Sequence, residues 1–166
     1  MARSKKPKVE IDAGGKYHAA LSNAEGGDRY EYDPKLTAQG CRRYGVKNMS
    51  GLFTCYACRP NKPHSWGSGI ICTELYLSAI NTYRVVFNAQ MCKLCNRYAR
   101  PKVDIDRYVA KVVDTFALWT GQRKAHAGNG PHKSTGPHDS SRCRGCLKGI
   151  CTMSDANKNK SKSKKR

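Results

Sequence analysis

Six of the nine cysteines in this chain form three pairs, and two residues separate the cysteines of each pair. The pairs are Cys55/Cys58, Cys92/Cys95 and Cys143/Cys146. Two cysteines at this spacing can direct both sulfurs to one ion, so each pair supplies half of a tetrahedral site. His138 and Cys151 flank the third pair and complete a set of eight candidate ligands. The sequence therefore predicts two zinc ions as cofactors, each held by four side chains.

The eight ligands can be shared between two ions in two ways. In local sharing, one ion is bound by Cys55, Cys58, Cys92 and Cys95, and the other by His138, Cys143, Cys146 and Cys151. In the interleaved alternative, the third pair completes the site of the first pair. We favour local sharing, because a strand returning from the first pair would place the second pair beside it. Of the remaining cysteines, Cys72 is expected in the core and Cys41 as a free thiol.

Hydrophobic periodicity predicts a small α+β zinc-binding domain: a zinc-ribbon-like antiparallel hairpin or sheet, one packed helix and a C-terminal zinc knuckle. Strands are expected at residues 52–55, 69–78 and 83–91, the last with a clear period of two. The helix begins after Asp104, a suitable N-cap, and ends at Gly121. Its expected core-facing residues recur at helical spacing; they are Ile105, Val109, Val112, Val113, Phe116 and, at the end of the helix, Trp119. A core of this size predicts that zinc removal unfolds the domain.

The ends of the chain differ from its middle in charge and pattern. The net charge is +19 overall and +9 between residues 9 and 157, and the rest comes from two basic ends without acids. We expect a mostly disordered region at 1–45, with a short helix near 34–39, the zinc-binding domain at 46–152 and a disordered lysine-rich tail at 153–166. The sequence shows neither a secretory signal nor a membrane span. Many cysteines without a signal indicate an intracellular location, in the cytoplasm or the nucleus.

Beyond the paired cysteines, flanking residues also form a pattern. Phe53 precedes the first pair, Trp66-x-Ser68 follows it, Gln90 precedes the second pair, and Gly136-Pro137-His138 precedes the third. Together with Cys146-x4-Cys151, this arrangement over residues 51–152 resembles the three-CxxC (3CxxC-type) zinc-binding family. That family includes receptor-transporting proteins, zygote arrest proteins and uncharacterised fungal proteins. Arg100-Pro101-x-x-Asp104 and the helix end Leu118-Trp119-x-Gly121 look most like the fungal branch. The resemblance implies zinc binding without catalysis, and the zygote arrest proteins offer a precedent for RNA binding.

Charge and aromatic residues favour a zinc-supported module that binds RNA or another polyanion. Tyrosines stand beside arginines at several positions, where they could stack on bases while the arginines neutralise phosphates. The candidates are Arg42, Arg43, Tyr44, Arg59, Arg97, Tyr98 and Arg100, with Tyr56 near Arg59. The alternative is a zinc-stabilised protein-interaction adaptor or trafficking chaperone. We expect no enzymatic activity, because cysteine and histidine can fill every metal position, and Asp139 is better placed to orient His138.

Overall fold

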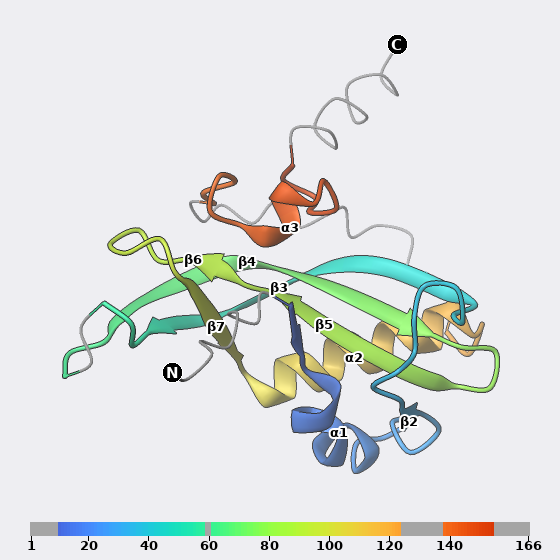
Figure 1. Ribbon diagram of the computed structural model, residues 1–166. Coiled ribbons are helices and arrows are strands. Elements are labelled where there is room, and N and C mark those ends of the chain that lie inside the picture. The colour runs from blue at the N-terminus through green and yellow to red at the C-terminus, as the bar shows by residue number, and fades with distance from the viewer. Residues whose placement is uncertain (1–9, 59–60, 124–137, 155–166) are drawn as a thin grey trace, which may run out of the picture.

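The computed structural model describes residues 10–58, 61–123 and 138–154 of the chain. A twisted, mainly antiparallel sheet of seven strands forms its centre (Figure 1). Its strands are β1 (Glu10–Asp12), β2 (Glu31–Tyr32), β3 (Arg43–Cys55), β4 (His64–Leu77), β5 (Thr82–Asn88), β6 (Gln90–Met91) and β7 (Tyr98–Val103). They follow the order β1-β5-β4-β3-β7-β6, and β2 pairs in parallel with β5. The expected α+β class with an antiparallel sheet is therefore observed.

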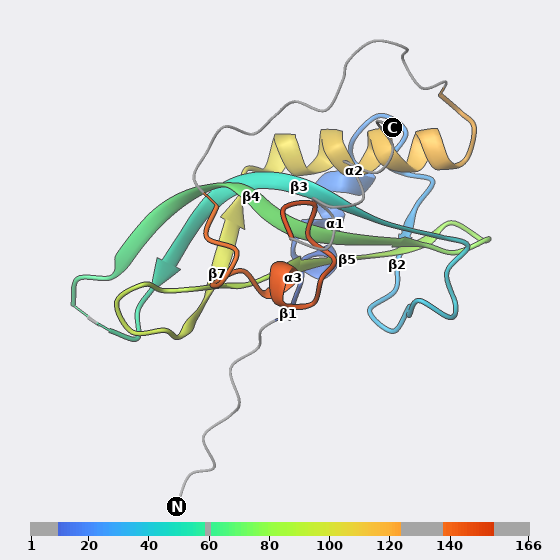
Figure 2. The ribbon, with the colours of Figure 1, turned by 90° about the horizontal axis from the view of Figure 1, so that it is seen from above.

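Helices cover the two faces of this sheet unequally. Helices α1 (Gly14–Ser22) and α2 (Ile105–Trp119) lie on one face, whereas the short α3 (Arg144–Leu147) lies on the other (Figures 1 and 2). Asp104 caps α2 as predicted, since its carboxylate accepts a hydrogen bond of 3.0 Å from the Arg107 N–H. Gly121 follows α2 with a φ of 74°, as a glycine C-terminal signal predicts. None of the helices in the described ranges is long and apolar enough to cross a membrane.

Two hydrophobic cores flank β4, because both of its faces are covered. Ile71, Leu75 and Leu77 belong to the larger core with α1 and α2. Ile70 and Cys72 belong to a smaller core with the C-terminal segment. Alternate residues of a strand point to opposite faces, so residues 70–75 are all buried. The expectation that Cys72 is a core residue is confirmed.

The N-terminal region is ordered from Glu10 onward, so the prediction of disorder over 1–45 is wrong for residues 10–45. Gly14 and Gly15 argue against a helix on propensity alone. The segment nevertheless folds as β1 and α1, because Tyr17 and Leu21, one helical turn apart, are both buried against the sheet and α2. Residues 34–39 form turns instead of the expected short helix. Residues 1–9 and 155–166 lie outside the described ranges.

The strands also differ from their predicted limits. β3 begins nine residues before residue 52, because its first half pairs with β4. Gly45 lets the Trp119 ring pack on this half, since a Cβ there would approach that ring to 2.7 Å. The expected strand at 83–91 divides into β5 and β6 around Ala89. β7 was not predicted, since Pro101 argues against a central strand. β6 pairs only with Tyr98 and Ala99, so Pro101 lies where β7 has a neighbour on one side.

Candidate metal centres

The first two cysteine pairs meet at one end of the sheet. Cys55 ends β3, Cys92 follows β6, and β7 returns between the two segments by pairing with both β3 and β6. The Sγ atoms of Cys55 and Cys95 are 3.6 Å apart, and Cys58 Sγ lies 3.9 Å from those of both Cys55 and Cys92. Four bonds of about 2.3 Å to one tetrahedral ion require sulfur separations of about 3.8 Å. The cluster therefore matches the geometry of a zinc site with four cysteine ligands.

Hydrogen-bond donors favour the thiolate form of two of the four cysteines in this cluster, whereas burial and the neighbouring thiols raise the pKa of Cys58 to about 12. Burial opposes ionisation of Cys55, yet the Ala57 N–H and the neighbouring thiol of Cys95 lower its pKa to about 7. The pKa of Cys92 is also lowered against the effect of burial, by the Leu94 N–H and by His64. A thiol must lose its proton to bind a metal, so these donors prepare the sulfurs of Cys55 and Cys92 for an ion.

His64 is a residue of this site that the sequence analysis missed. Its Nδ1 lies 3.3 Å from Cys92 Sγ, and its ring stacks on Trp66 at a centroid distance of 5.3 Å. His64 reaches the site because it pairs with Cys55 across β3 and β4. An imidazole bonded to a ligating sulfur adjusts the charge of the site without occupying a coordination position. The strand register reveals this contact, since His64 lies 28 residues before Cys92 in the sequence.

The third pair forms a second cluster on the opposite face of the sheet from α2. It brings together His138, Cys143, Cys146 and Cys151, whose ligand atoms all lie within 4.8 Å of one another. His138 Nε2 is 3.1 Å from Cys146 Sγ and 3.9 Å from Cys151 Sγ. Gly149, with a φ of 72°, reverses the chain after α3 and allows the Cys151 N–H to bond the Gly145 carbonyl at 3.0 Å. The structure thus groups the eight ligands as local sharing predicts.

Cys72 lies beside this second cluster without belonging to it. Its thiol contacts the sulfur of Cys151, and this contact and burial both raise the pKa of Cys72. Hydrogen bonds from the thiols of Cys143 and Cys72 in turn lower the pKa of Cys151. Gly145 is essential to this arrangement, because a Cβ there would lie 2.4 Å from Cys72 Sγ. In the described chain, Cys41 joins neither cluster, and its thiol bonds the Ala38 carbonyl at 3.2 Å.

Backbone pairing joins the two clusters. Cys143 forms a bridge with Gln90 of β6, and the Met91 N–H bonds the Arg142 carbonyl at 2.8 Å. The Arg142 guanidinium bonds the Cys92 carbonyl at 3.2 Å and the Asn96 side chain at 2.8 Å. Asp139 forms an ion pair of 2.9 Å with Arg142. The expected contact of Asp139 with His138 is thus replaced by one that holds the third pair beside the second.

The predicted nucleic-acid residues fall into separate places. Tyr98 and Arg100 lie on β7, and Arg97 is exposed in the turn before it. Arg42, Arg43 and Tyr44 lie at the other end of β3, where the Tyr44 hydroxyl donates to Glu74 at 3.1 Å. Arg59 lies outside the described ranges. The structure therefore places Tyr98 and Arg100 near the first metal cluster and separates them from the group at residues 42–44.

The chemistry of both clusters fits zinc. Thiolate and imidazole ligands in a tetrahedral arrangement favour zinc over harder cations such as magnesium or calcium. The clusters supply four sulfurs in one case, and three sulfurs with one imidazole in the other. Bound ions would cross-link β3 to the segment after β6, and would close the loop around α3. The structure is thus consistent with two zinc ions in two separate sites.

Comparison with known families agrees with this assignment. The model of a zinc-binding domain, the three-CxxC zinc ribbon, matches residues 48–149. That range includes all three cysteine pairs and His138, and ends just before Cys151. No curated protein and no solved structure is significantly similar to the chain. Because the match spans more than half of the chain and the paired cysteines converge as such a domain requires, this protein belongs to the three-CxxC zinc-ribbon family of zinc-binding domains.

Proposed function

We propose that this protein is a non-enzymatic, zinc-supported module that binds RNA or another single-stranded polyanion. The observation that carries the proposal is a groove of about 440 Å³ beside the first metal cluster. We call it the basic groove, and its defining residues are Lys16, Tyr56, Tyr98, Arg100 and Lys102. Three cations and two tyrosines along one groove combine phosphate neutralisation with surfaces for base stacking.

Strand geometry explains why these side chains share one surface. Arg100 and Lys102 alternate along β7 with buried Ala99, Pro101 and Val103, so they point away from the core. Arg100 lies opposite Thr54 of β3, and Lys102 lies opposite Leu52, so neighbouring strands extend the same exposed face. Tyr56 is 66% exposed and follows Cys55 directly, so the metal cluster fixes the backbone that carries it. The aromatic and basic groups are therefore held in place before any ligand binds.

Structural metal sites support the non-enzymatic part of the proposal. Each cluster offers four protein ligands, so a zinc ion bound there has no open position for water or substrate. A protein-interaction adaptor is the second candidate function. The observation in its favour is an apolar groove between α1 and α2, on another surface of the molecule.

A titration of labelled single-stranded RNA, followed by fluorescence polarisation at two salt concentrations, tests the basic groove. Arg100→Ala and Tyr56→Ala are each expected to lower affinity about tenfold, through a lost phosphate contact and a lost stacking surface. Deleting residues 155–166 should weaken binding and flatten its salt dependence, because fewer counterions are released.

Arg43→Ala is the matched control for charge, since it removes one exposed arginine at the far end of β3. Each variant is first checked for two bound zinc ions. If Arg43→Ala weakens binding as much as Arg100→Ala, diffuse charge and not the basic groove attracts the RNA. Absence of binding at low salt would refute the RNA proposal and leave the adaptor function as the better one.

A further inference from the structure

We propose that the groove between α1 and α2 is a docking site for a cationic amphipathic helix of a partner protein. The groove has a volume of about 550 Å³. The helices that line it, α1 and α2, lie on the opposite face of the sheet from α3 (Figures 1 and 2). It is separate from the basic groove, so this inference does not depend on RNA binding. We call it the helix groove.

The wall formed by α2 carries more apolar surface than the core uses. Tyr108, Val112 and Phe116 form the stripe that is fully buried against the sheet. A second stripe lines the helix groove at intervals of one helical turn; it consists of Ile105, Val109, Val113 and Ala117. Ile105 is 50% exposed, so the prediction that it faces the core is wrong. Val109 and Val113 pack in part against the core, so their remaining surface and the exposed side of Ile105 are available to something outside the described chain.

The opposite wall of the groove includes two alanines. Ala20 of α1 and Ala24, two residues after its end, line the groove with the second stripe of α2, and Ala110 lies on the α2 rim. Small side chains let another backbone approach closely, whereas long ones would fill the groove themselves. Two helices lying side by side with an apolar furrow between them form the type of surface on which a third helix packs.

Charge around the helix groove specifies the class of partner. Glu25, Asp106 and Asp114 line it, and Arg123 is its single basic residue within the described chain. Asp114 pairs with Arg123, whereas Glu25 and Asp106 form no ion pair with any residue that the structure describes. In a chain with a net charge of +19, this is a local acidic rim around apolar surface. A partner helix with leucine-like residues on one stripe and lysine or arginine beside it complements both features.

The same charges argue against other occupants. A two-fold dimer through this groove would bring the acidic rim of one copy against that of the other. The lysine-rich segment at 155–166 has the right charge but no large apolar side chain to fill the furrow. The partner that fits the helix groove therefore presents apolar and cationic side chains on the same surface.

Two synthetic peptides test the inference on the intact, zinc-loaded protein. One has leucine at helical spacing with lysine elsewhere, and the other has glutamate in place of lysine. The lysine peptide is expected to bind at least about tenfold more tightly, and to shift the amide resonances of Ala20, Ala24, Val109 and Val113. Ala110→Arg should reduce its affinity about tenfold by filling the furrow and adding a like charge. Ala19→Arg is the matched control, because Ala19 is an exposed alanine of α1 that does not line the groove.

Several results would overturn the proposal. Equal binding of both peptides, equal effects of Ala110→Arg and Ala19→Arg, or resonance shifts elsewhere would exclude a cationic helix in this groove. Concentration-dependent self-association that Ala110→Arg abolishes would identify a second copy as the occupant. A change in the groove resonances on deleting residues 155–166, without any peptide, would identify the tail.

Discussion

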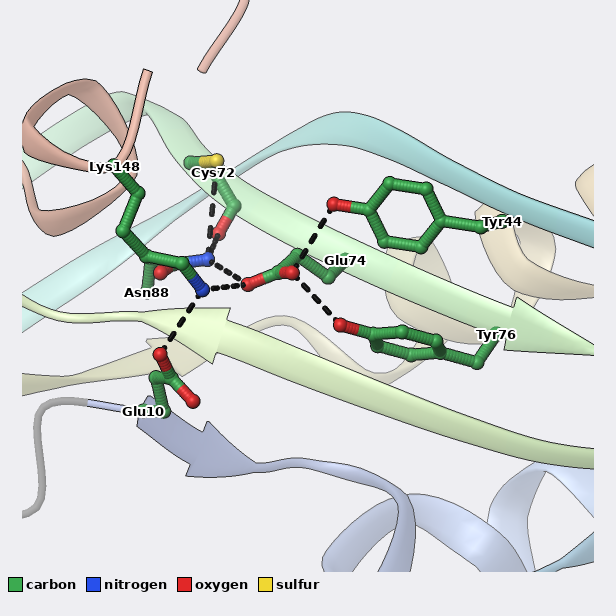
Figure 3. A network of polar contacts seen from close by, with 7 residues as sticks. All are labelled: Glu10, Tyr44, Cys72, Glu74, Tyr76, Asn88 and Lys148. Carbon is green, nitrogen blue, oxygen red and sulfur yellow. Dashed lines mark hydrogen bonds and ion pairs between the residues drawn. The ribbon is translucent and has the colours of Figure 1, made fainter. Parts of the chain in front are cut away.

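Glu74 is a charged residue buried in the middle of β4, on the face that carries the second metal cluster. One of its oxygens accepts from Lys148 at 2.8 Å and from Asn88 at 2.9 Å, and the other accepts from the hydroxyls of Tyr44 and Tyr76 (Figure 3). Burial opposes its charge, but these donors lower the pKa of Glu74 below its usual value of 4.5. The pKa of Glu74 is therefore lower in the folded protein than in the unfolded chain. Ionised Glu74 accordingly stabilises the fold at neutral pH, and this stabilisation is lost as the pH falls through the folded-state pKa.

Glu74→Gln should therefore destabilise the protein at pH 7. We expect a loss of about 2–3 kcal/mol in the free energy of unfolding, because the Lys148 ammonium would lose its buried partner. Glu10→Gln is the control, since Glu10 bonds the same ammonium at 2.9 Å from an exposed position. Its expected cost is below about 1 kcal/mol. Urea denaturation with excess zinc measures both values, and equal losses would show that burial of Glu74 adds nothing.

At the scale of elements, α3 and its flanking turns form a unit that depends on its own metal cluster and on β6. The helix has only four residues, too few to be stable alone. Its attachments are the bridge between Gln90 and Cys143, the small core around Cys72, and the ion pair of Lys148 with Glu74. The second metal ion therefore stabilises a segment that packing alone would leave weakly folded.

Cys143→Ala tests whether this unit binds its metal ion independently of the first cluster. Local sharing predicts that the variant loses the ion of the second cluster and keeps that of the first, because Cys143 contributes no sulfur there. Native mass spectrometry should find one zinc ion in Cys143→Ala, and two in the wild type and in the control Cys41→Ala. Loss of the first ion as well, with Cys55 and Cys58 exposed to alkylation, would support the interleaved arrangement.

The whole molecule consists of a sheet held by a large core on one face and by metal clusters at its end and its other face. The small core expected from the sequence predicts that removing zinc unfolds the whole domain. The larger core that is observed predicts that only part of the structure is lost when zinc is removed. Tyr17, Phe87, Tyr108 and Phe116 pack between the sheet and both helices at a distance from the second cluster. This half of the molecule has the burial that allows it to remain folded without zinc.

Chelation should therefore have different effects on different parts of the molecule. We expect amide hydrogens of α3 and of residues 92–97 to lose protection against exchange, while those of α2 and β5 keep most of theirs. Hydrogen-exchange mass spectrometry before and after chelator addition measures this difference, and zinc addition should restore protection. Uniform loss of protection, together with loss of the helical circular dichroism signal, would show that the ions stabilise the entire fold.

Local chemistry explains what the sequence alone determined. Cysteine spacing predicted the paired ligands, because chelation by a Cys-x-x-Cys pair depends on nearby residues. The limits of α2 were predictable as well, since Asp104 and Gly121 act within one helical turn. These features are encoded over a few residues and need no knowledge of the rest of the chain.

Contacts between distant segments decided the remainder. Helix α1 forms despite its glycines because Tyr17 and Leu21 are buried by strands and a helix far along the chain. His64 becomes a neighbour of Cys92 only through the pairing of β3 with β4. The two faces of β4 both become buried only when α2 and the C-terminal segment pack against them. Sequence pattern reports which residues favour burial, but only the tertiary structure determines the partner that buries each of them.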